Sequence, residues 1–80
     1  MQIKVIGTGC DKCTRLYQNV QQAVATLGLT ADVSKVEDLV EIVKMGVMSV
    51  PALAVDGKVV SLGKVLKAEE VVKLLQKAQG

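Results

Sequence analysis

The sequence predicts an α/β fold in which helices flank a four-stranded mixed sheet, in the order β-α-β-α-β-β-α. Three observations predict it. The hydrophobic period changes from strand to helix twice in the first half of the chain. Asp56-Gly57, between two apolar runs, is the strongest hairpin signal in the sequence. The last apolar pattern is helical again. We expect a single domain over residues 1–80, because this length is near the lower limit for independent folding.

The first half predicts a strand, a helix and a second strand. Residues 2–6 form a short apolar strand that is closed by Gly7-Thr8-Gly9. From Asp11 the apolar residues follow the helical period as far as Gly28, which is a favourable C-terminal stop. Residues 29–33 then predict a second strand. A strand–helix–strand unit of this kind is expected to be right-handed, with its two strands parallel.

A second helix is predicted after this unit. Ser34, with Glu37 three residues on, has the pattern of a capping box, which marks a helix start. We expect the helix to end near Gly46. Its apolar face is predicted to consist of Leu39, Val40, Ile42 and Val43.

The remaining residues predict a hairpin and a closing helix. A loop over residues 47–50 leads to Pro51, the only proline of the chain. Residues 52–55 and 58–62 are the hairpin strands, which we expect to join the sheet antiparallel. The last helix is predicted over residues 68–78, with acidic residues in its first turn.

Composition argues against nucleic-acid binding and against a membrane span. Ten basic and eight acidic residues give a net charge of +2, too small for a strong steering field. Tyr17 is the only aromatic residue and is expected in the core, so stacking platforms for bases are missing. No apolar run approaches the roughly 20 residues of a membrane helix, and strand-like sequence follows Met1 without a leader. We expect a cytoplasmic monomer that binds neither nucleic acid nor membrane.

Cys10-Asp11-Lys12-Cys13 lies where the first strand gives way to the helix, and it contains the only two cysteines. The spacing lets the two sulfurs meet, and a helix N-terminus favours the thiolate form at Cys10. As a structural staple such a short loop would contribute only about 2 kcal/mol. In a reducing cytosol a pair of this kind is more often catalytic or metal-binding. Redox chemistry, metal binding and two buried apolar residues all remain open at this point.

These features together resemble the thioredoxin superfamily. The resemblance rests on Cys-x-x-Cys at the end of the first strand, a Val50-Pro51 step before the third, a tight hairpin and a closing helix. The length and the Gly7-Thr8-Gly9-Cys10 segment are more similar to small glutaredoxin-like proteins, also called redox-active disulfide proteins. The resemblance covers nearly the whole chain. It implies a thioredoxin fold and a thiol–disulfide oxidoreductase.

The resemblance also implies a role for each site residue. Cys10 would be the exposed nucleophile, and Cys13 the thiol that resolves the mixed disulfide. Pro51 would follow a cis peptide bond and face the cysteine pair, and Val50 would offer its backbone to an extended substrate segment. Neither a cofactor nor a metal is expected. The expected rim of the substrate site consists of Thr8, Gly9 and Met48.

Three departures from the family pattern matter for partners. Gly9 replaces the usual aromatic residue before the motif, and Asp11-Lys12 replaces Gly-Pro inside it. Residues 2–6 contain no acid that would help to deprotonate Cys13. Residues 61–64 lack the Gly-Gly and acidic cap with which glutaredoxins bind glutathione. We expect a disulfide-containing protein or small molecule as substrate, and a reductase of the thioredoxin-reductase kind rather than glutathione.

Two other functions would use the same cysteine pair. Small copper chaperones also place Cys-x-x-Cys after their first strand, but their β-α-β-β-α-β order ends on a strand. They usually have Met two residues before the motif, where this chain has Thr8. Met45 and Met48 would be the soft copper ligands, although core packing or a partner surface accounts for them better. A redox sensor would use the pair without turnover.

Overall fold

A computed structural model describes residues 1–8 and 11–79 of the chain. Its element order is the one that the sequence predicts, so the fold class is confirmed. The elements are β1 (Gln2–Ile6), α1 (Asp11–Leu27), β2 (Asp32–Val36), α2 (Leu39–Lys44), β3 (Ala52–Val55), β4 (Lys58–Leu62) and α3 (Ala68–Gln79).

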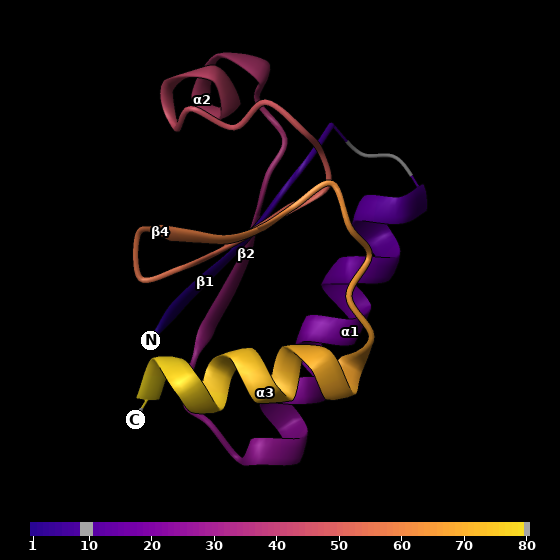
Figure 1. The fold of residues 1–80 in the computed structure, drawn as a ribbon, viewed down its shortest axis with the longest axis vertical. Helices are drawn as coiled ribbons and strands as arrows, with labels where there is room; N and C mark the ends of the chain where they lie inside the picture. The colour runs from indigo at the N-terminus through magenta and orange to yellow at the C-terminus, as the bar shows by residue number, and fades with distance from the viewer. Residues whose placement is uncertain (9–10, 80) are drawn as a thin grey trace.

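In the described part of the chain, four strands form one mixed sheet in the order β2-β1-β3-β4. β1 is parallel to β2 and antiparallel to β3, and β3 is antiparallel to β4. Helices α1 and α3 lie on one side of the sheet, and α2 lies on the other side (Figure 1). The start of α1 lies on the opposite side of the molecule from the start of β1 and the end of α3 (Figure 1).

The face of the sheet under α1 and α3 carries the larger core. Ile3 pairs with Val55 and Val5 with Leu53 across β1 and β3, which directs four branched side chains to this face. The buried stripe of α1 and the apolar face of α3 pack on them. The buried residues of this core are Ile3, Val5, Leu16, Val20, Ala23, Leu53, Val55, Leu66, Val71 and Leu75.

The face under α2 carries a smaller core. The alternate positions of β1 and β3 supply Ile6 and two alanines, and α2 and the loop after it supply the rest. Met45 and Val36 pack on its edge. The buried residues of this core are Ile6, Ile42, Val47, Ala52 and Ala54.

The predicted position of the second strand is wrong by three residues. β2 begins at Asp32, whose N–H donates to the carbonyl of Met1 at 3.0 Å. Residues 29–31 instead lead the chain back from the end of α1, and the N–H of Leu29 donates to the carbonyl of Val24 at 3.1 Å. Leu29 packs against the larger core from this turn. Its apolar side chain is therefore partly buried without strand pairing.

The predicted capping box is wrong for the same reason. Ser34 lies inside β2, paired with Lys4, and cannot cap a helix there. The N-cap of α2 is Asp38, whose Oδ1 accepts a hydrogen bond from the N–H of Val40 at 2.9 Å. The helix is also less amphipathic in space than its sequence suggests. Ile42 is buried, whereas Leu39, Val40 and Val43 are exposed.

The predictions for β1, α1 and the hairpin are confirmed at their bounds. The turn between β3 and β4 holds Asp56 and Gly57 at φ values of 49° and 84°, the conformation for which Asp-Gly is favoured. Tyr17 lies at the edge of the larger core and is half-buried, with Lys35 Nζ 4.6 Å from its ring centroid. Among the described residues, no helix has the length and apolarity needed to cross a bilayer.

Candidate functional site

Cys13 lies in the first turn of α1 and is buried, with 6% of its surface exposed. The helix begins at Asp11, as expected, so Cys13 falls on the stripe that faces the sheet. The predicted nucleophile Cys10 and the predicted rim residue Gly9 lie outside the described residues. Cys13 therefore lies where the first turn of α1 meets the end of β1.

Gly7, directly after β1, forms the surface on which Cys13 packs. Its N–H donates to the carbonyl of Val36 at 2.9 Å, which continues the parallel pairing of β1 and β2. A Cβ at this position would clash with the Cys13 Sγ and lie 3.2 Å from the Cys13 Cβ and 3.9 Å from the Pro51 Cα. Three segments therefore converge here so closely that a glycine is needed.

Pro51 approaches the same point from the start of β3. The Val50-Pro51 peptide bond is cis, as predicted, and the Pro51 side chain is fully buried. Its carbonyl accepts a hydrogen bond from the N–H of Gly63 at 2.8 Å, which ties the loop before β3 to the end of β4. The structure thus brings Pro51 and Cys13 together around Gly7, as the resemblance implies.

The other predicted rim residues are accessible. Thr8, after the end of β1, is exposed, and Val50 is exposed beside the buried Pro51. Met48 is 92% exposed, so its interpretation as a core residue is wrong, and the interpretations as a partner surface and as a soft copper ligand stay predictions. Met45 is partly buried against the smaller core. An apolar, accessible loop therefore precedes Pro51.

Two charged residues that the sequence analysis missed also line this site. Lys35 and Glu37 border a cavity of about 10 Å³ together with Val5, Gly7, Cys13 and Thr14. A space of this size holds at most about one water molecule. Residues 2–6 contain no acid, whereas Glu37, directly after β2, lines the same cavity as Cys13. The correct register of β2, which places Val36 beside Gly7, is the signal that would have identified both residues.

The described residues outside the cysteine motif do not form a metal centre. Within residues 1–8 and 11–79, no three His, Cys, Asp or Glu side chains are grouped so that they could hold a metal ion. What the geometry does offer is a cysteine in a first helical turn, next to a cis-proline loop. A second sulfur one turn away on such a helix can form and break a disulfide with the first.

Comparison with known proteins gives the same family along most of the chain. Residues 1–76 match the thioredoxin domain family. A thioredoxin of Methanothermobacter thermautotrophicus is 39% identical over 75 residues, which is 94% of this chain and 97% of that protein. A thioredoxin of Methanocaldococcus jannaschii is 42% identical over 69 residues, which is 86% of this chain and 79% of that protein. The family match runs from β1 into the last turns of α3.

Proposed function

Because the chain belongs to the thioredoxin family, we propose that it is a thiol–disulfide oxidoreductase whose reactive dithiol is Cys10 and Cys13. Family membership makes it a thioredoxin-like redox protein, and the proposal adds the residues and the mechanism. The observation that carries it is the burial of Cys13 in the first turn of α1, against Gly7, near which Pro51 also lies. A thiol in this place is shielded from solvent, and it follows the preceding cysteine by three residues in the sequence.

The proposed reaction has two exchange steps. The Cys10 thiolate attacks one sulfur of the substrate disulfide, so that a mixed disulfide forms and the first substrate thiolate leaves. Cys13, after losing its proton, then attacks the Cys10 sulfur of the mixed disulfide. The Cys10–Cys13 disulfide forms, the second substrate thiolate leaves, and both substrate thiolates take up protons. Two electrons pass from the dithiol to the substrate in each cycle.

The substrate is proposed to lie along the loop before β3. Val50 would offer its backbone to an extended substrate segment beside Pro51, and exposed Met48 would contact the same segment. Thr8 and Gly9 would form the opposite rim. In this proposal the chain acts as a single thioredoxin-like domain, and no cofactor takes part.

Trapping of mixed disulfides tests the assignment of the two cysteines. The Cys13→Ser variant is expected to accumulate substrate-linked protein, because the second step has lost its attacking sulfur. The matched Cys10→Ser variant is expected to trap little, since its remaining sulfur is buried. Non-reducing electrophoresis after incubation with a disulfide substrate measures both. Equal trapping by the two variants, or stronger trapping by Cys10→Ser, would overturn the assignment.

Turnover assays test the reductant and separate the alternatives. We propose that a reductase of the thioredoxin-reductase kind, rather than glutathione, regenerates the dithiol. Reduction of insulin is expected to proceed with the reductase and NADPH, and to be slower when glutathione replaces them. The absence of turnover with both would favour a redox sensor. Turnover only with glutathione would reverse the assignment of the reductant.

A further inference from the structure

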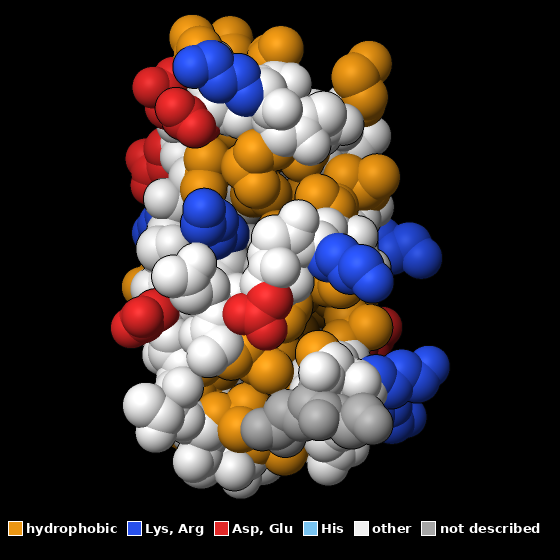
Figure 2. Space-filling model, turned by 90° about the vertical axis from the view of Figure 1, so that its left-hand side faces the viewer, with side chains coloured by type: hydrophobic (Ala, Val, Ile, Leu, Met, Phe, Trp, Pro, Cys, Tyr) orange, Lys and Arg blue, Asp and Glu red, His pale blue; other side chains and the backbone are white. Residues whose placement is uncertain are grey.

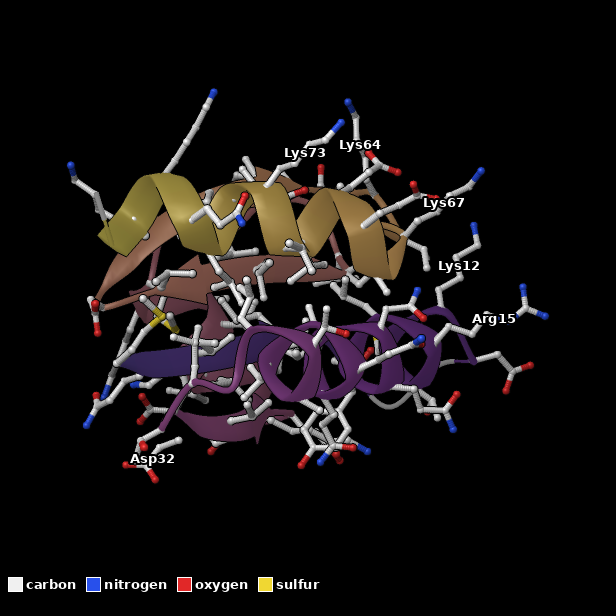
Figure 3. All side chains as sticks on the ribbon, turned by 90° about the horizontal axis from the view of Figure 1, so that it is seen from below. Lys12, Arg15, Asp32, Lys64, Lys67 and Lys73 are labelled. Atoms are coloured by element: carbon white, nitrogen blue, oxygen red, sulfur yellow. The ribbon has the colours of Figure 1, made fainter. Side chains whose placement is uncertain are left out.

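Four exposed cationic side chains come from two segments that are distant in the sequence but pack against each other. Lys12 and Arg15 come from the first two turns of α1, and Lys64 and Lys67 come from the segment that joins β4 to α3. All four are exposed. Figure 3 shows them along one side of the molecule, extending into solvent. We call these four residues the basic rim.

Specific contacts hold the two halves of the basic rim together. The Asn19 side-chain Nδ2 donates to the carbonyl of Leu66 at 2.8 Å, which fixes the β4–α3 segment against α1. Leu66 itself is buried in the larger core. At the other end of the segment, Gly63 donates to the carbonyl of Pro51. The backbone that carries these two lysines is therefore held between α1 and the loop that carries Pro51.

The surrounding acids reduce the positive charge of the basic rim but do not cancel it. Asp11 is exposed at the start of α1, and Glu69 and Glu70 lie in the first turn of α3. Glu70 is engaged locally, because its Oε1 accepts a hydrogen bond from the N–H of Lys67 at 3.3 Å. Residues 11–15 and 63–70 together hold the four cations of the rim and three acids, Asp11, Glu69 and Glu70, which leaves a net charge of +1.

The opposite charge collects elsewhere. Residues 32–44, which contain β2 and α2, hold four acids and two lysines. Figure 3 shows Asp32 at the far side of the molecule from the basic rim. Glu37 of this segment lines the cavity of Cys13, whereas Asp32 lies far from the basic rim, so the net charge of +2 hides a partial separation of charge.

From this separation we infer that the disulfide partners of this protein present an acidic segment, and that the basic rim binds it. The inference rests on the proposed function, since Lys12 and Arg15 lie on either side of Cys13 in the sequence of α1. Fixed charges beside a reactive site act mainly on the rate of encounter, and their effect falls as salt screens them. An acidic protein segment next to the disulfide would therefore be attracted, and a basic one repelled.

Two peptides that differ only in charge test this inference. Both carry the same intramolecular disulfide, flanked by glutamates in one and by lysines in the other. With the reduced protein at about 0.02 M salt, the acidic peptide is expected to be reduced about tenfold faster, and the difference is expected to shrink at about 0.5 M salt. Rates are measured under single-turnover conditions. Equal rates at low salt, or preference for the basic peptide, would overturn the inference.

Charge-reversal variants test whether the basic rim causes the preference for the acidic peptide. Lys64→Glu/Lys67→Glu is expected to remove or invert the preference, and Lys64→Arg/Lys67→Arg is expected to keep it. The control Lys58→Glu/Lys77→Glu makes the same change in net charge at the other end of the molecule, where the β3–β4 turn meets the end of α3 (Figure 1). This control is expected to keep the preference. A control that loses it as fully as the rim variant would show that net charge alone is responsible.

The outcomes also separate this inference from the proposed function. Circular dichroism of each variant confirms that the helical content is retained. If wild-type protein reduces neither peptide at any salt concentration, the proposed oxidoreductase activity is wrong. If it reduces both peptides at the same rate, the activity stands and the acidic partner is rejected.

Discussion

The two faces of the sheet are built from side chains of different size, although they share the same two central strands. The face under α1 and α3 carries Ile3, Val5, Leu53 and Val55. The face under α2 carries Ile6, Ala52 and Ala54. Because alternate residues of a strand point to opposite faces, one sequence pattern produces both surfaces. Large side chains hold the helix that bears Cys13, and small ones lie under the short helix α2.

This difference shows where the molecule holds its site firmly and where it presents surface. α1 is long and its buried stripe packs on the larger core, so the position of Cys13 is fixed from several sides. α2 has six residues and exposes most of its apolar side chains. Hydrophobic side chains gather at that end of the molecule in the space-filling view (Figure 2). Its packing therefore stabilises the fold less than that of α1.

Truncation of one core residue on each face tests this comparison, and the largest effect is expected on the α1 face. Leu53→Ala should lower the free energy of unfolding by about 4 kcal/mol, and Ile42→Ala by about 2 kcal/mol, within the range of such changes. Both side chains are buried, at 0% and 3% exposure. The loss for Ile42→Ala is expected to be smaller because the short helix α2 can shift to fill the cavity that the substitution leaves. Urea unfolding followed by circular dichroism measures both, and equal losses would contradict the comparison.

The second expected effect lies where α1 meets the end of β1. Gly7→Ala introduces a Cβ that clashes with the Cys13 Sγ, so the variant should lose about 1–3 kcal/mol of stability. It should also slow disulfide reduction, since Cys13 must shift away from its place beside Pro51. Ser61→Ala in β4 is the control for a small change outside this contact, and it should change stability by less than about 0.5 kcal/mol. Normal stability and activity of Gly7→Ala would show that the contact is not tight.

Local patterns predicted most of the fold, and pairing between distant residues determined the rest. β1, α1 and the hairpin have their own boundary signals, and these elements are found where the sequence predicted them. The start of β2 depends on its pairing with Met1 and Gln2, which no local pattern contains. The error of three residues also hid Glu37, because its place on the cavity of Cys13 follows from that register.

The site was predictable to the same extent. The family resemblance predicted the cis bond before Pro51, which the structure confirms. The cysteine spacing predicted Cys13 as a site residue, and this stays a prediction. The close contact of Gly7 depends on the position of the Cys13 side chain, which only the packed structure shows. The basic rim was hidden for a similar reason, since it joins segments that are far apart in the chain.

The smallest expected effect concerns the start of α2, where prediction and structure disagree. Asp38→Ala removes the Oδ1 that accepts the hydrogen bond of Val40, and a lost N-cap costs about 1 kcal/mol. Ser34→Ala, at the residue that the sequence pattern favoured as the cap, should change stability by less than about 0.5 kcal/mol, because Ser34 is exposed in β2. Urea unfolding compares the two variants directly. A larger loss for Ser34→Ala would restore the capping box and with it the earlier start of the helix. A larger loss for Asp38→Ala would instead show that the N-cap of α2 is Asp38, although this helix packs only weakly on the sheet.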